Sequence, residues 1–118
     1  MKNQSLSWRL RNACEGIKAS WQSEHTFRIH VTAVILIVIV LAFLKPTAVW
    51  WALLLLTCGL VITLELVNTA IEKLADHIHP EQHQAIKIVK DTLAGAVFLA
   101  SLLAVCVFIT FIASQVSL

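Results

Sequence analysis

Residues 29–64 read IHVTAVILIVIVLAFLKPTAVWWALLLLTCGLVITL, and Lys45 is the only charged residue among them. A second long stretch is also uncharged, because no charged residue follows Asp91. A soluble fold of this size would have to expose charged side chains along both stretches. The two stretches therefore predict helices that span a membrane.

The overall composition favours the same class of protein. Of the 118 residues, 58% are hydrophobic and 14% are charged, and the mean hydropathy is +0.82. The net charge of +2, with no basic run, does not favour nucleic-acid binding, although it suits an anionic membrane surface. Cys14, Cys58 and Cys106 stand singly and predict no disulfide framework. We expect one all-α integral membrane domain over residues 1–118.

The hydrophobic pattern predicts four helical segments. Apolar residues recur at spacings of three and four over residues 5–22, which predicts an amphipathic helix lying on the membrane surface; packing on a protein partner is the alternative. The expected spans are 27–45, 47–77 with a cytoplasmic extension, and 80–117, which combines a cytoplasmic turn with the third span. We expect Pro80 to occupy the first turn of the last helix.

The distribution of basic residues predicts the orientation in the membrane. Eight of the nine lie before the first span or between the second and third, and only Lys45 lies across the membrane. Basic residues favour the cytoplasmic side. We therefore expect a cytoplasmic N-terminus and a C-terminus on the periplasmic or extracellular side. The eight are Lys2, Arg9, Arg11, Lys18, Arg28, Lys73, Lys87 and Lys90.

Three polar side chains share one face of the second span. Glu65, Asn68 and Glu72 stand at positions i, i+3 and i+7, which a helix places on one side. Glu65 ends a long uncharged run, and an ionisable group at a membrane interface indicates a functional site. Pairing with a basic residue of a neighbouring helix is the structural alternative.

This acidic cluster favours phosphoryl transfer. Glu24 and Glu72 offer the hard oxygen ligands that Mg²⁺ takes together with phosphate oxygens, and Lys90 offers a positive charge for phosphates. Glu65, the deepest carboxylate, is the candidate base for a hydroxyl group. The sequence has no glycine-rich phosphate loop, so a nucleotide site would have to be built from helices. The histidines at 77, 79 and 83 lie in a turn and do not favour a zinc site.

The stretch Glu65-Leu66-Val67-Asn68-Thr69-Ala70-Ile71-Glu72 resembles the E-[ILV]-x-N-[ST]-A-[IV]-E signature of the prokaryotic diacylglycerol kinases and the related undecaprenol kinases. The resemblance extends to residues 21–24, 80–83 and 90–91 and to the three-span hydropathy, so it covers almost the whole chain.

The resemblance implies a role for each matching residue. Glu65 would be the general base, Glu24 and Glu72 would hold the magnesium bound to ATP, and Asn68 would order the active-site face. The implied nucleotide contacts are Glu24, Glu72, Glu81, Gln82, His83, Lys90, Asp91 and Arg9, with Arg11 as the alternative to Arg9. The implied lipid contacts are Glu65, Trp21 and Ala94. Members of the family are homotrimers with shared active sites, which implies a homotrimer in the bacterial inner membrane.

The lipid substrate and two other functions stay open. Diacylglycerol is the first choice, although Ile29-His30 resembles the undecaprenol-kinase branch. A non-enzymatic subunit of a membrane complex would need polar residues such as Asn68 only to join helices. An ion or proton pathway would favour ionisable residues in the middle of the spans, and the sequence has none there.

Overall fold

The computed structural model describes residues 5–81 and 83–116, which form four α-helices. These helices are α1 (Leu6–Ser23), α2 (His25–Leu44), α3 (Ala48–Ile78) and α4 (Gln84–Val116). The described residues contain no strand, so the all-α prediction is confirmed. The range expected for the last segment ends at residue 117, which lies outside the described residues.

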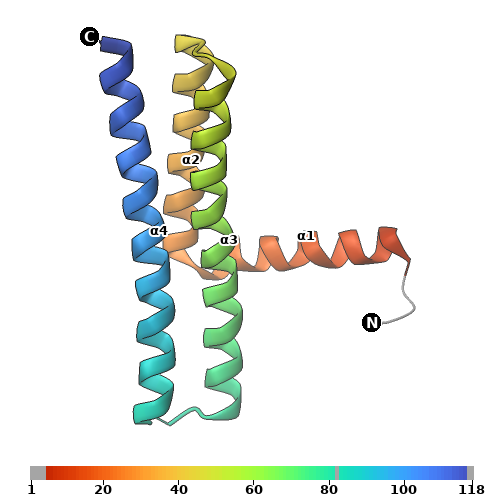
Figure 1. Ribbon diagram of the computed structural model, residues 1–118. Coiled ribbons are helices and arrows are strands. Elements are labelled where there is room, and N and C mark those ends of the chain that lie inside the picture. The colour runs from red at the N-terminus through yellow and green to blue at the C-terminus, as the bar shows by residue number, and fades with distance from the viewer. Residues whose placement is uncertain (1–4, 82, 117–118) are drawn as a thin grey trace.

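Helices α2, α3 and α4 are each long and apolar enough to cross a membrane. The prediction of three spans is confirmed, and the protein is a membrane protein. The 20 residues of α2 measure about 30 Å along the helix axis, which matches the hydrocarbon core of a bilayer. Helices α3 and α4, with 31 and 33 residues, are longer and extend beyond the start of α2 at one end (Figure 1).

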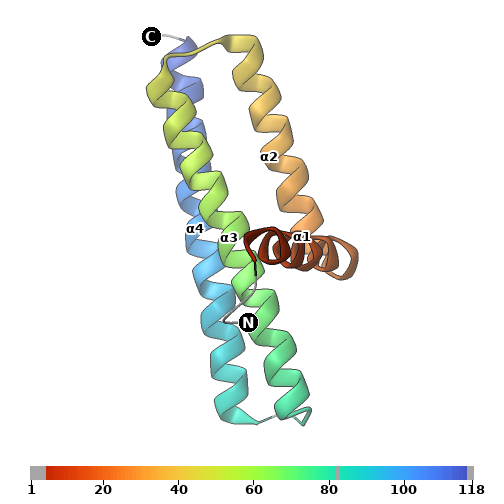
Figure 2. The same ribbon diagram turned by 90° about the vertical axis from the view of Figure 1, so that its right-hand side faces the viewer.

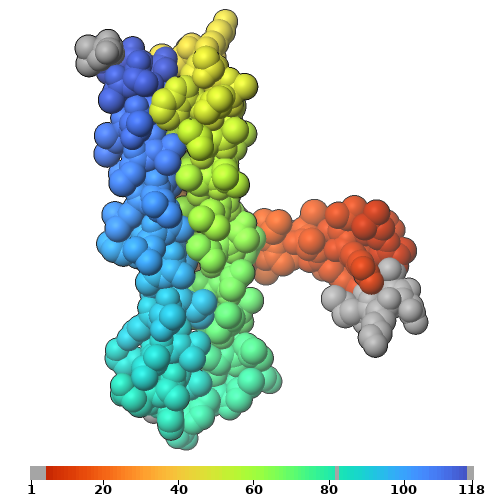
Figure 3. All heavy atoms as spheres, in the orientation of Figure 1, coloured from red at the N-terminus to blue at the C-terminus, as the bar shows by residue number. Residues whose placement is uncertain are grey.

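The three long helices run side by side, and α1 projects sideways from the start of α2 (Figures 1 and 2). The α2–α3 connection lies at the same end of the bundle as the C-terminal end of α4, and the α3–α4 connection lies at the other end. In the space-filling view most of α1 stands clear of the bundle (Figure 3). At the level where α1 meets the bundle, side chains of the shorter helix α2 and of the longer helices α3 and α4 can therefore come together.

Helix α1 begins directly after a capping serine. The Ser5 hydroxyl accepts a hydrogen bond from the backbone N–H of Trp8 at 3.3 Å, which caps the first turn. Most apolar side chains of α1 are exposed; Leu6 retains 73% of its accessible surface and Leu10 retains 57%. That this helix lies on the membrane surface stays a prediction.

The α2–α3 connection is closed tightly by Lys45. This residue adopts the left-handed conformation (φ 48°), and its N–H donates to the Leu41 carbonyl at 2.9 Å. Beside this turn Leu41, Leu54 and Phe111 form a fully buried cluster, and the Trp50 ring packs on Phe111 with centroids 5.4 Å apart. The hairpin is therefore anchored at the end opposite the α3–α4 connection.

The α3–α4 connection differs from the expectation for Pro80. Helix α4 begins only at Gln84, where the ring nitrogen Nδ1 of His83 accepts the Ala85 N–H at 3.0 Å. The imidazole thus satisfies a backbone donor that the first turn would leave unpaired. Pro80 lies in the connection before this cap, so its placement in the first turn of the helix was wrong.

Candidate functional site

The corner between α1 and α2 positions Glu24. Glu24 is extended (φ −117°, ψ 109°), and its N–H donates to the Ser20 carbonyl at 2.9 Å. The Arg28 guanidinium donates to the carbonyl oxygens of Trp21 at 2.9 Å and Gln22 at 3.3 Å. These carbonyls end α1 and carry partial negative charge, so the cation stabilises the corner. Glu24 is held where the chain turns from one helix into the next.

Helix α3 brings the second set of polar side chains to the same level. Glu65 follows Ala48 by 17 residues, about 26 Å along the helix, which places it near the far side of the membrane. Glu65 and Thr69 each retain only 6% of their accessible surface, whereas Asn68 and Glu72 are half-buried. A carboxyl group buried at this depth needs a polar partner.

A groove of about 530 Å³ joins the corner to α3 and α4. We call it the polar groove. It brings together five of the residues that the sequence singled out: Glu24, Glu65, Asn68, Glu72 and Ala94. Its remaining lining residues are Thr26, His30, Thr69, Val97, Phe98 and Ser101.

His30 is the partner of Glu65 in the polar groove. Its Nδ1 lies 3.1 Å from Oε1 of Glu65, although the ring N–H is not aligned for a hydrogen bond. The sequence pattern did not predict that His30 would be in the site. His30 is an ionisable residue at the N-terminal end of an apolar run, and this signal could have identified it as a site residue.

The polar groove has an acidic lining. It is lined by three carboxylates, and its described lining residues include no lysine or arginine. The side-chain oxygen Oδ1 of Asn68 is buried without a hydrogen-bond partner. No group of three or more His, Cys, Asp or Glu side chains in the described part of the chain could hold a metal ion. Mg²⁺ commonly takes one or two carboxylates and completes its octahedron with phosphate oxygens and water, so Glu24 and Glu72 carry the type of donor atom that this ion prefers.

Four predicted nucleotide contacts lie in a different pocket, beside the α3–α4 connection. This pocket of about 240 Å³, which we call the turn pocket, is lined by His79, Pro80, Glu81, His83, Ile86, Lys87, Lys90 and Asp91. Lys90 pairs with Asp76 at 2.6 Å. Lys87 pairs with Asp91 at 2.6 Å. The predicted contact Gln82 lies outside the described residues.

Two other predicted contacts line neither the polar groove nor the turn pocket. Arg9 is exposed and precedes Glu24 by 15 residues, about 22 Å along α1. Trp21 is 42% exposed near the end of α1, and its carbonyl accepts the hydrogen bond from Arg28.

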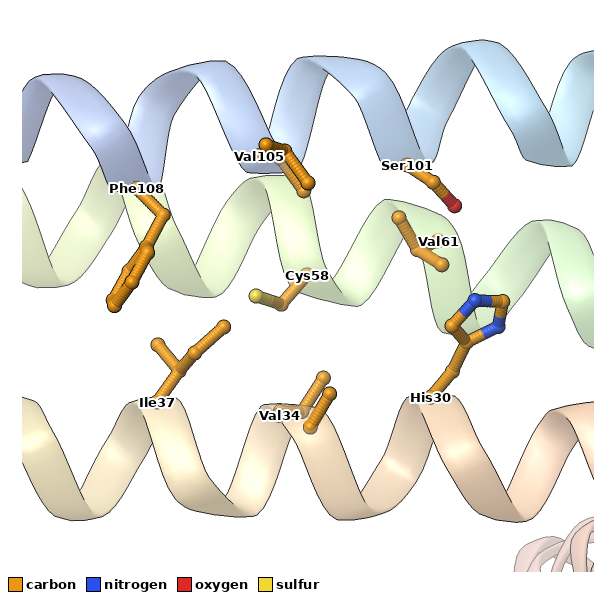
Figure 4. Close-up of a pocket in the computed structure, with 10 residues that line it drawn as sticks. His30, Val34, Ile37, Cys58, Val61, Ser101, Val105 and Phe108 are labelled. Atoms are coloured by element: carbon orange, nitrogen blue, oxygen red, sulfur yellow. The ribbon is translucent and has the colours of Figure 1, made fainter.

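An apolar groove of about 230 Å³ adjoins the polar groove. It runs between α2 and α4, and side chains of α3 line it as well (Figure 4). His30 and Ser101 line both grooves, and the other labelled residues of the apolar groove are Val34, Ile37, Cys58, Val61, Val105 and Phe108. The two grooves together offer an apolar surface that leads to a buried carboxylate.

The fold and these grooves define a small multi-spanning helical membrane protein with an acidic site at one end of its shortest span. Residues 11–112 match the family described as prokaryotic diacylglycerol kinase, and the chain belongs to this family. The family expected from the signature at residues 65–72 is thereby confirmed.

Individual relatives carry two names. A diacylglycerol kinase of Synechocystis is 38% identical over 98 residues, which are 82% of this chain and 56% of that protein. A diacylglycerol kinase of Escherichia coli K12 is 33% identical over 105 residues, 89% of this chain and 81% of that protein. An undecaprenol kinase of Bacillus subtilis is 34% identical over 86 residues, 73% of this chain and 70% of that protein. The matched segment thus spans just over half of the Synechocystis relative and most of the other two.

Proposed function

We propose that this protein is a lipid kinase that transfers the γ-phosphoryl group of ATP to the hydroxyl group of a membrane lipid. The observation that carries the proposal is the meeting of Glu24, Glu65 and Glu72 in one groove, at the level where α1 meets the three long helices. A lipid hydroxyl can approach such a groove from the membrane, and a nucleotide can approach it from water. The names of the relatives support the same activity.

Glu65 serves as the general base in this proposal. Its carboxylate accepts the hydroxyl proton while the lipid oxygen attacks the γ-phosphorus. The bond between the γ-phosphorus and the bridging oxygen breaks, and ADP leaves with that oxygen. Glu65 suits this role because it is the most deeply buried carboxylate of the polar groove and lies where the apolar groove begins.

Glu24 and Glu72 hold the magnesium ion that accompanies ATP, and Asn68 orders the surface between them and Glu65. Three carboxylates would repel a triphosphate unless a cation stood between them. Bound magnesium supplies that neutralising charge and orients the phosphates. The partnerless oxygen of Asn68 supports this role, because it provides a further neutral ligand or a hydrogen-bond acceptor for a coordinated water.

The turn pocket supplies the remaining nucleotide contacts in this proposal. Glu81, His83, Lys90 and Asp91 line it, and Lys90 can turn from Asp76 toward a phosphate because both side chains of the pair are exposed. Gln82 belongs to the same proposed set through the family resemblance alone.

Diacylglycerol is the lipid substrate we propose first, with Glu65, Trp21 and Ala94 in contact with it. Ala94 lines the polar groove, and the indole of Trp21 is exposed beside the corner. Undecaprenol is the second candidate, and one observation favours it. His30, which belongs to the Ile29-His30 pair that resembles the undecaprenol-kinase branch, lines both grooves. The relative from Bacillus subtilis is named for that substrate.

We propose further that the protein is a homotrimer with shared active sites in the bacterial inner membrane. This assembly is proposed from the resemblance to the family. The N-terminus would face the cytoplasm and the C-terminus the other side, as the basic residues favour.

Phosphate transfer from labelled ATP tests the proposal directly. Purified protein would be assayed in mixed micelles with diacylglycerol or undecaprenol, with magnesium present or chelated. We expect magnesium-dependent labelling, and the labelled lipid identifies the substrate. No labelling of either lipid by folded protein would refute the kinase and favour the non-enzymatic subunit.

A further inference from the structure

The imidazole of His30 meets the carboxylate of Glu65 across two helices. Nδ1 lies 3.1 Å from Oε1, and 25% of the histidine side chain is exposed against 7% of the glutamate side chain. Figure 4 shows the His30 ring extending from α2 toward α3, near Val61. The contact is therefore between a half-buried ring and a nearly inaccessible carboxylate.

Among residues 5–81 and 83–116, His30 is the ion-pair partner of Glu65, and the other two ion pairs do not involve this carboxylate. Arg28, the nearest cation along α2, is engaged by the carbonyls that end α1, and Lys90 is paired with Asp76. Besides His30, the polar residues that share the polar groove with Glu65 are Glu24, Thr26, Asn68, Thr69, Glu72 and Ser101. The hydroxyl of Ser101 donates to the Val97 carbonyl of its own helix. The imidazole is the side chain placed to orient Glu65.

We infer that His30 is a positioning residue, which holds one carboxylate oxygen of Glu65 through Nδ1 and leaves the other oxygen to take the lipid proton. This inference rests on the proposed function, because it assigns His30 to the base of that reaction. Nδ1 carries a proton in one neutral tautomer and in the imidazolium, so it can donate in either form. Hydrogen bonds of this kind often align fully only in the substrate complex.

The position of the ring supports this role. His30 and Ser101 are the residues that line both the apolar and the polar groove. A lipid whose chains lie in the apolar groove would pass the imidazole where its hydroxyl group reaches Glu65. A side chain that holds the base at this place determines the orientation of the Glu65 carboxylate. Orientation matters because misplacement of a reacting group by about 1 Å can slow a reaction by about 100-fold.

Substitutions of His30 that keep, move or remove the nitrogen donor at the place of Nδ1 test the inference. The amide nitrogen of asparagine can take the place of Nδ1, that of glutamine extends toward the place of Nε2, and phenylalanine keeps the ring without a donor. We expect His30→Phe and His30→Gln to lower kcat by about 10- to 100-fold with little change in KM for ATP. His30→Asn should restore most of kcat. Thr32→Val, on the same helix but exposed, is the matched control and should retain the wild-type kcat.

An infrared measurement separates this inference from the proposed function. The infrared band of the Glu65 carboxylate is identified as the band that Glu65→Gln removes. Its frequency should shift in His30→Phe and should be close to the wild-type frequency in His30→Asn. If wild-type protein phosphorylates lipid but His30→Phe keeps both its kcat and the band position, the inference is overturned. If Asn and Gln variants lose activity equally, His30 has only a packing role. If the wild type is inactive, the kinase proposal fails, and the band shift alone still decides whether His30 holds Glu65.

Discussion

The Arg28 guanidinium donates a hydrogen bond of 2.9 Å to the backbone carbonyl of Trp21, seven residues earlier in the chain. It also donates to the Gln22 carbonyl, so one side chain of α2 caps the end of α1. The extended residue between the two helices is Glu24, a member of the polar groove. The cap therefore sets the direction of α1 and the position of a proposed magnesium ligand at the same time.

Arg28→Ala is expected to destabilise the protein by about 1 kcal/mol, because a charged hydrogen bond to helix-terminal carbonyls is lost at a half-exposed site. It should also raise the magnesium concentration needed for half-maximal activity, since Glu24 is no longer held. Unfolding in mixed micelles and a magnesium titration measure the two effects. Lys18→Ala, which removes an exposed cation of α1, is the control. Equal stability and an equal magnesium requirement in Arg28→Ala would contradict this account of the corner.

Glu65→Gln is expected to lower kcat by at least about 100-fold, because glutamine keeps the size and hydrogen bonding of the side chain but cannot accept the hydroxyl proton. Thr63→Val, an exposed position on the same helix, should leave kcat unchanged. Initial rates of phosphate transfer, with circular dichroism as the measure of folding, provide the comparison. Turnover at the wild-type rate by a folded Glu65→Gln protein would show that Glu65 is not the base.

Glu24→Gln and Glu72→Gln are each expected to raise the magnesium concentration for half-maximal activity by about tenfold or more, since each removes one anionic ligand. The measurement is a magnesium titration of initial rate at saturating ATP. Glu15→Gln, an exposed acidic residue of α1, supplies the matched loss of charge away from the polar groove. A magnesium requirement that stays at the wild-type value in both variants would count against their roles as ligands.

The helical period was sufficient to predict the shared face of Glu65, Asn68 and Glu72, because residues three and four apart lie together on any helix. The three spans were equally predictable, since hydropathy over about 20 residues reports directly on the solvent that a helix requires. Each of these features is determined by the residues of a single helix, so each could be predicted without knowing how the helices pack.

The contacts of His30 and Arg28 could not be predicted in the same way. His30 meets Glu65 only because α2 and α3 are antiparallel and in a particular register, which the Lys45 turn and the buried cluster of Leu41, Leu54 and Phe111 set together. Arg28 reaches back to Trp21 only because the chain turns at Glu24. Each contact depends on the angle or the register between two helices.

Lys90→Met is expected to raise KM for ATP by about tenfold, because it removes a positive charge proposed to bind phosphate, and a tenfold change corresponds to about 1.4 kcal/mol. Lys90 now pairs with Asp76, and an exposed pair contributes at most about 1 kcal/mol to stability, so the variant should remain folded. Asp76→Asn frees the lysine and should leave KM unchanged or lower it. Lys73→Met, an exposed cation of α3, is the control. ATP titrations of initial rate measure KM for each variant. A rise in KM for Lys90→Met alone supports a phosphate contact. Equal rises for Lys90→Met and Asp76→Asn would show that the ion pair itself, rather than the free lysine, supports nucleotide binding.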